Sequence, residues 1–174
     1  MNKVNLRLLA GWLIANHQNL VESNSFDMGW FRGDHKGICA FVDKNNCGTV
    51  GCALGWSPVS GIKPLKTNIR DFTKGSINHG IETLTLDFDK YCERVFGIKL
   101  GNPDRQNDAY WGWCFDEQWV EFDNTPKGAA IRIMYLLNHT EEVVEWEDIG
   151  IGWYSNTSVS KYMAWWENEG KKEW

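Results

Sequence analysis

The chain has 174 residues, of which 43% are hydrophobic, 24% are charged and 14% are aromatic, and it includes 11 Trp. This composition is that of a globular protein and excludes a disordered chain, and the length predicts a single domain, residues 1–174, that needs no metal or disulfide to bury a core. The formal net charge is −5. Together these values indicate a compact, aromatic-rich, mildly acidic protein. They do not indicate any particular enzymatic activity.

The first half of the chain shows four local patterns. Apolar residues at helical spacing predict a helix over residues 4–21. A short, partly β-branched run bounded by Gly and Asp predicts a strand over residues 37–42. Thr49 is a suitable cap for a short helix that runs to Trp56. The segment 57–81 is rich in Gly, Lys, Asn and Thr and is typical of an irregular excursion.

The second half carries clearer helix boundaries. A helix is predicted over residues 87–96 with Gly97 as its terminator, and a loop is predicted over residues 98–109. Thr125 as N-cap and Pro126 as the first helical residue begin a further helix that extends to about residue 138.

The last predicted helix begins at Ser155 or Thr157 and presents one apolar face to the core. That face consists of Val159, Tyr162, Met163 and Trp166. The run 110–115, Tyr-Trp-Gly-Trp-Cys-Phe, fits neither a helical nor a strand period. All these patterns predict a mainly α fold with a minor β component (α+β), in a compact single domain with irregular Trp-rich loops.

Membrane insertion and secretion are not expected from the sequence. The stretch of residues 48–62 is uncharged, but Gly, Ser and Pro break it and it is too short for a membrane span. The N-terminal residues form a polar-interleaved helical pattern rather than a signal peptide. We therefore expect a cytoplasmic protein. Its five Cys lack a dense framework and indicate reduced thiols, with Cys92 and Cys114 buried.

Charge is distributed unevenly along the chain. Residues 1–80 carry 9 basic and 5 acidic side chains, whereas residues 81–174 carry 9 basic and 18 acidic ones. The acidic residues are densest between Asp104 and Asp148. This asymmetry favours a basic protein partner, or mimicry of a polyanion, over direct binding of nucleic acid. The other interpretation is a solvated acidic face that keeps the protein soluble.

A glycine-rich segment, residues 47–56, is the most distinctive local motif. At the start of its predicted helix, Gly48, Thr49 and Val50 would offer free backbone amides and a hydroxyl to a small anion or a nucleotide, with a nearby aromatic ring to stack on it. The segment lacks the spacing of a P-loop. The alternative is a tightly packed, buried turn.

Four residues of one region could in principle hold zinc. They are His35, Cys39, Cys47 and Cys52. Their spacings of three, seven and four residues lack the Cys-x-x-Cys knuckle of structural zinc sites, so no metal or other cofactor is predicted, although the sequence leaves the zinc question open. Thiol catalysis is not expected either, because the four His are scattered over four different segments. The paired carboxylates indicate solvated charge rather than acid–base catalysis.

The tryptophans fall into two groups by their sequence neighbours. Trp12, Trp56 and Trp166 lie on apolar faces and are expected in the core. A second group of six, some of which are expected to be partly exposed, consists of Trp111, Trp113, Trp119, Trp146, Trp153 and Trp165. Exposed Trp rimmed by acids is typical of a protein-binding hot spot, although any one of these Trp could equally be a core residue. The contact surface predicted on this basis is Trp111, Trp113, Asp116, Glu117, Trp119 and Glu121.

Several segments together resemble a group of small uncharacterised proteins of bacteriophages and bacterial genomes. The matching pieces are Arg7-Leu-Leu-Ala-Gly-Trp-Leu13, Phe26-Asp-Met28, Cys47-Gly-Thr-x-x-Cys52 with Gly55, residues 88–96, Thr125-Pro126 and Val144-Glu-Trp146. The chain departs from the pattern in residues 57–81, in the Trp-rich segment after Gly97 and in the C-terminal helix. The resemblance implies a phage or mobile-element accessory protein in the bacterial cytoplasm, and it implies no activity.

Two functions are therefore expected from the sequence. The first is a non-enzymatic phage factor that binds, and thereby inhibits, a host protein through the acidic, Trp-rich surface. The second is a small-ligand or nucleotide-binding protein that uses the helix start at Thr49. A zinc or thiol enzyme is the third possibility. The oligomeric state and the identity of the partner cannot be read from the sequence.

Overall fold

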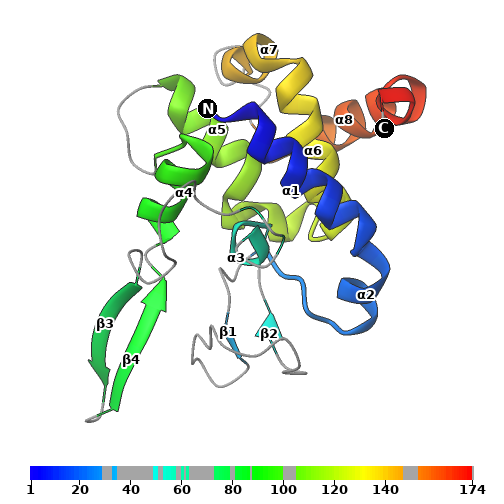
Figure 1. Cartoon of the computed structure of the whole chain (residues 1–174). Helices are drawn as coiled ribbons and strands as arrows, with labels where there is room; N and C mark the ends of the chain where they lie inside the picture. The colour runs from blue at the N-terminus through cyan, green and yellow to red at the C-terminus, as the bar shows by residue number, and fades with distance from the viewer. Residues whose placement is uncertain are drawn as a thin grey trace.

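The computed structural model describes residues 1–28, 33–34, 49–50, 53–57, 60, 62, 73–78, 81–86, 88–99, 105–146 and 153–173. Most of these residues are helical, which confirms the prediction of a mainly helical chain. In Figure 1 the helices form the upper body, and two small strand pairs extend below it. Buried side chains from the longer helices belong to one hydrophobic core.

The first helix, α1 (Lys3–Ala15), packs along α6 (Pro126–Asn138). Its buried residues, spaced three and four apart, are Leu6, Leu9, Ala10 and Leu13. The side-chain amide of Asn16 donates to the carbonyl of Trp12 at 2.8 Å, and a second helix, α2 (His17–Glu22), follows. The single helix predicted over residues 4–21 is therefore divided in two at an Asn that hydrogen-bonds its own helix end.

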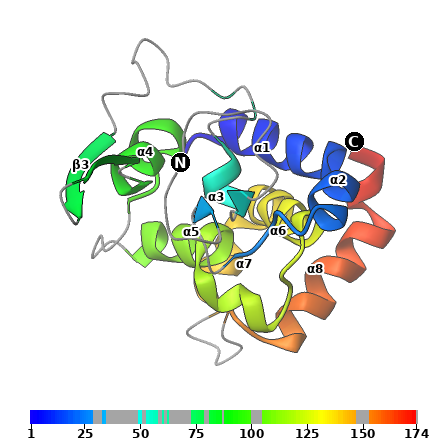
Figure 2. The ribbon, with the colours of Figure 1, turned by 90° about the horizontal axis from the view of Figure 1, so that it is seen from below.

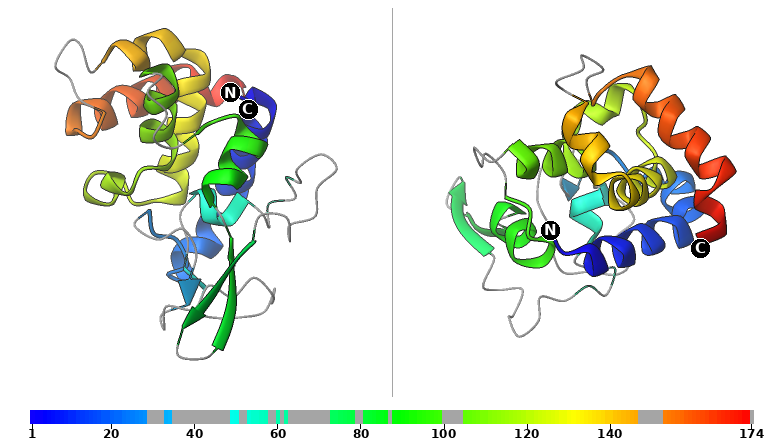
Figure 3. Two further views of the ribbon diagram at one scale, coloured as in Figure 1. Left: turned by 90° about the vertical axis from the view of Figure 1, so that its left-hand side faces the viewer. Right: turned by 90° about the horizontal axis from the view of Figure 1, so that it is seen from above.

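The central helix of the body is α6. It begins as predicted, because Thr125 Oγ1 accepts a hydrogen bond from the Gly128 N–H at 2.9 Å and Pro126 occupies the first turn. Every α6 residue from Pro126 to Leu137 is buried except Lys127. Because such a helix must be surrounded on all sides, α1, α5 (Arg105–Phe115) and α8 (Asn156–Asn168) lie around it (Figure 3, right).

The remaining helices are short. They are α3 (Ala53–Trp56), α4 (Phe88–Phe96), the 3-10 helix η3 (Glu117–Glu121), α7 (Thr140–Glu145) and the 3-10 helix η4 (Gly170–Glu173). Gly97 ends α4 at a φ of +65°, as predicted. Ser155, rather than Thr157, caps α8 by accepting from the Ser158 N–H at 3.1 Å.

Two antiparallel strand pairs are present among the described residues. In the first, β1 (Gly33–Asp34) pairs with β2 (Thr49–Val50); in the second, β3 (Thr73–Asn78) pairs with β4 (Ile81–Leu86) over six positions. The β3–β4 hairpin projects away from the helices (Figures 1 and 3, left). Its strands show that residues 73–78 are not the irregular excursion expected there. The strand predicted over residues 37–42 lies outside the described residues.

The prediction of irregular Trp-rich loops is wrong for residues 105–121, because these residues form the helices α5 and η3. Gly112 is one reason why the sequence pattern did not indicate a helix here. A Cβ added there would lie 2.7 Å from the ring of Trp153, so this glycine is a packing gap that the indole fills rather than a helix break. Residues 109–115 are all buried, which removes the amphipathic period by which a surface helix is recognised.

Gly128 is predicted to tolerate no side chain. A Cβ at this position would overlap the Asp123 carboxylate, so Gly128→Ala must displace the carboxylate and is expected to lower the free energy of unfolding by about 2–4 kcal/mol. Urea denaturation measures the change. The matched control is Gly11→Ala in α1, where helix propensity predicts a gain of up to about 1 kcal/mol. Equal effects at the two glycines would contradict the packing at Gly128.

Candidate protein-binding surface

The turn η3 and its N-cap residue carry the three acidic residues predicted to contact a partner. Asp116 caps the turn by accepting a hydrogen bond from the Gln118 N–H at 2.9 Å. The carbonyl of Trp119 accepts from the backbone N–H of Phe122 at 3.1 Å and of Asp123 at 2.8 Å. These bonds close a compact turn.

Trp119 holds this turn against the core. Its side chain is fully buried, and its indole N–H donates to the carbonyl of Gly112 at 2.9 Å. Its ring meets those of Trp113 and Tyr154 edge-on, each with centroids 5.4 Å apart. The guanidinium carbon of Arg132 lies 4.2 Å from the centre of the Trp119 ring, a cation–π contact.

A buried charge pair lies beneath the turn. Arg132 is fully buried, and its Nη1 lies 3.1 Å from the carbonyl oxygen and 3.5 Å from Oδ2 of Asp123. The Asp123 carboxylate also accepts hydrogen bonds from Thr125 Oγ1 at 2.8 Å and from the Tyr162 hydroxyl at 2.5 Å. A buried charge is tolerated only when it is paired in this way. The network therefore fixes the end of η3, the first turns of α6 and the middle of α8 relative to one another.

The three Trp predicted to lie on the contact surface are in the core. Trp111 is 5% exposed, and Trp113 and Trp119 are fully buried. Trp113 donates from its indole to the carbonyl of Arg132 at 2.6 Å. Its ring contacts one ring each from η3, α6 and α8, and the ring of Trp146, which follows α7. The prediction that these three indoles are exposed was wrong because polar sequence neighbours do not determine exposure in a helix that is enclosed by others.

The other described Trp side chains are either buried in the core or half-buried. Trp146 is fully buried and Trp165 is 9% exposed, so both belong to the core, while Trp153 is half-buried. Trp166 is buried as predicted. Trp12 and Trp56 are half-buried and stack on each other, with ring centroids 6.0 Å apart. Cys92 and Cys114 are buried, as predicted.

The outer face of η3 consists of polar and acidic side chains around one apolar residue. Glu117, Gln118 and Glu121 are exposed, Asp116 is half-buried, and Val120 is 40% exposed. Sequence reasoning missed Val120. The spacing of Trp119 and Phe122, one turn of a 3-10 helix apart, could have shown it, because it directs these two rings inward and Val120 outward.

The acidic side chains of η3 and those of α7 form two separate groups rather than one face. One group belongs to η3, before α6, and the other consists of Glu141, Glu142 and Glu145 on α7, after it. A helix of 13 residues, about 20 Å long, separates them. In Figure 1, α7 lies at the upper end of α6 and the chain that enters α6 lies at the lower end. Glu117 and Glu121 can therefore be tested separately from Glu141 and Glu145.

Within the second group, the Glu142 side chain is bonded to other residues of the chain. It pairs with Lys161, and it accepts a hydrogen bond from the Tyr135 hydroxyl at 2.9 Å. Burial alone would raise the pKa of Glu142, but the bonds from Lys161 and Tyr135 outweigh it and lower that pKa. Lys161 also lies 4.8 Å from the centre of the Trp146 ring.

The predicted ligand site at Gly48, Thr49 and Val50 depended on a helix that begins at Thr49, and the structure has no helix start there. Thr49 and Val50 form β2, and α3 begins at Ala53, so Thr49 does not cap the helix. Gly48 lies outside the described residues, as do the four candidate zinc ligands His35, Cys39, Cys47 and Cys52. Over the ranges that the structure does describe, no three His, Cys, Asp or Glu side chains are grouped to hold a metal ion.

Comparison with known proteins adds no assignment. No family model, curated protein or solved structure matches this chain. None of the helices that the structure describes is long and apolar enough to cross a membrane. The candidate surface is therefore judged on its own geometry, in which buried aromatic rings hold an exposed acidic turn.

Four of the five tyrosines are predicted to ionise late in the folded protein. Burial raises the pKa of Tyr91 to about 12, and it is the main cause of the raised pKa of Tyr135, Tyr154 and Tyr162. Above pH of about 10 the unfolded chain releases phenolic protons that the folded chain keeps, so the free energy of unfolding should fall as pH rises from about 10 towards 12. Ultraviolet absorbance of tyrosinate, compared with the chain in guanidinium, checks this. Ionisation of most tyrosines near pH 10 in the native protein would contradict their burial.

Proposed function

We propose that this chain is a non-enzymatic accessory protein of a bacteriophage or mobile element, and that it binds a basic host protein through the outer face of η3. The observation that carries the proposal is the presentation of Glu117 and Glu121 beside the exposed Val120, on a turn held by the buried Trp119. An apolar centre with a charged rim is the usual anatomy of a protein–protein contact. A turn already held in place loses little entropy when it binds.

The chemistry of the described groups supports binding rather than catalysis. Burial raises the pKa of the Cys114 thiol well above its ordinary value, which opposes formation of the nucleophilic thiolate. Asp123 and Arg132 pair with each other, and Glu142 pairs with Lys161. These groups hold the fold together, whereas Glu117 and Glu121 are exposed.

The identification as a phage or mobile-element factor rests on the resemblance of the sequence segments described above. On the same basis we propose a location in the bacterial cytoplasm, where the acidic turn would meet host proteins. Binding to a small ligand at Thr49 is not carried forward, because the helix start that motivated it is not there.

The test is quantitative affinity capture from bacterial lysate with the double variant Glu117→Lys/Glu121→Lys. Reversing both charges replaces attraction by repulsion at the contact, so capture of the specific partner should fall at least about tenfold. The lost partner should carry a basic surface, and its capture should weaken with rising salt.

The matched control is Glu141→Lys/Glu145→Lys, which makes the same change of net charge at the other end of α6. This control should retain the partner. If the two double variants lose the same proteins to the same degree, only net charge matters and the η3 surface is wrong. Retention of every partner by both variants would also overturn it.

A further inference from the structure

The helix α1 carries a second apolar stripe on the side away from α6. Val4 is 66% exposed and Leu8 is 56% exposed, the two highest values for large hydrophobic residues in the described part of the chain. Gly11 and Ala15 continue the stripe at steps of three and four residues, and neither is buried. This is the spacing of a seam between two packed helices, yet no described helix covers it.

The stripe has a large half and a small half. Val4 and Leu8 lie towards the N-terminal end of α1, and Gly11 and Ala15 lie towards its C-terminal end. In an antiparallel pair of two such helices, Leu8 lies opposite Gly11 of the second copy and Val4 lies opposite Ala15. Both pairings share one centre, between residues 9 and 10, so a single two-fold axis satisfies them together. Large residues then fill the space that small residues leave.

Charge selects the same antiparallel orientation. The charged side chains of α1 are Lys3 and Arg7, both in its first half, and its last turn carries no basic residue. An antiparallel copy moves these cations to the C-terminal end of the other α1, where the helix dipole is negative. A parallel copy would place the cations of both helices together.

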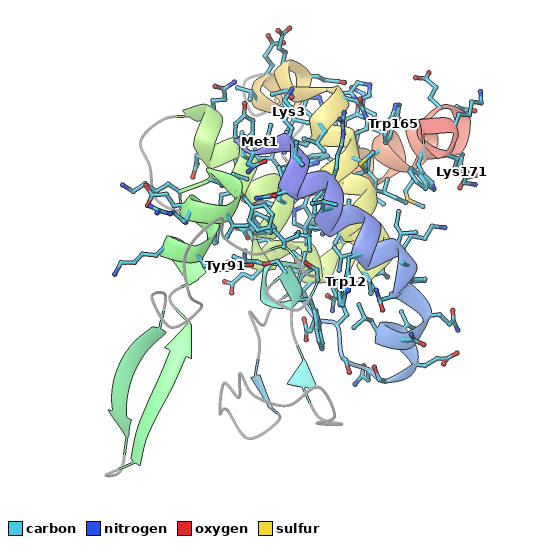
Figure 4. The ribbon with its side chains drawn as sticks, viewed as in Figure 1. Met1, Lys3, Trp12, Tyr91, Trp165 and Lys171 are labelled. Atoms are coloured by element: carbon cyan, nitrogen blue, oxygen red, sulfur yellow. The ribbon has the colours of Figure 1, made fainter. Side chains whose placement is uncertain are left out.

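We propose that the Val4–Leu8–Gly11–Ala15 stripe of α1 binds a second copy of this chain, antiparallel and about a two-fold axis. In views from below and above, α1 lies at the edge of the helical body (Figures 2 and 3), and Figure 4 places Lys3 near its N-terminal end. This contact is independent of the acidic turn η3, so the dimer and the proposed function can fail separately.

Sedimentation velocity of the full chain over a concentration series tests the dimer. A contact made by one helix pair is small, so association is expected at roughly 10–500 µM. Leu8→Glu should raise the dissociation constant at least about tenfold by placing a charge in the seam. Gly11→Leu should weaken the dimer by a similar factor because it fills the gap that receives Leu8, although its higher helix propensity supports the fold.

Val120→Glu is the matched control, because it replaces an exposed Val on η3 by a charge and should leave the dissociation constant unchanged. Denaturant unfolding of each variant confirms that it is folded. A protein that stays monomeric throughout the series overturns the proposal, as does self-association that either α1 variant leaves intact. Leu8-dependent binding of a monomer to anionic phospholipid vesicles would also overturn it and would assign the stripe to a membrane surface.

Discussion

Burial of the Arg132 guanidinium is the constraint on which the rest of the helical body depends. A charge in the core must be paired, and Asp123 supplies the counter-charge from the chain that joins η3 to α6. The Asp123 carboxylate is held in turn by Tyr162 of α8, and the ring of Trp119 covers the guanidinium. The ion pair and the bonds to Asp123 therefore fix the end of η3, the start of α6 and the middle of α8 relative to one another.

Two of the buried tryptophans also satisfy backbone carbonyls inside the helical body. Trp113 donates to the carbonyl of Arg132, and Trp119 donates to the carbonyl of Gly112. Each indole therefore buries its polar atom in a hydrogen bond while its ring fills the core. The buried tryptophans affect the protein surface only indirectly. The aromatic rings do not contact a partner, but they set the position of the acidic turn that is proposed to do so.

The sequence predicted those features that depend on local chemistry. The start of α6 was predicted from Thr125 and Pro126, the start of α8 from Ser155, and the end of α4 from Gly97. These boundaries are predictable because the hydrogen bonds and backbone conformation at a helix terminus involve only neighbouring residues. The buried state of Cys92 and Cys114 followed from the usual preference of free thiols. The exposed acids Glu117 and Glu121 were also identified from the sequence.

Features that depend on long-range packing were not predictable in this way. The burial of Trp113 depends on Tyr135, Trp146 and Tyr162, which lie more than 20 residues further along the chain. Gly112 resembled a break in the pattern because its partner, Trp153, is distant in sequence. Thr49 resembled a helix cap, but it pairs as a strand with Asp34.

A double-mutant cycle tests most directly whether the buried ion pair organises the body. The free energy of unfolding is measured by urea denaturation for the wild type, Arg132→Met, Asp123→Asn and the double variant. If the two side chains act as a unit, the effects of the single changes are not additive, and the coupling energy should be about 1–3 kcal/mol. Additivity within about 0.5 kcal/mol would contradict the account, because it would mean that Arg132 and Asp123 contribute to the fold independently.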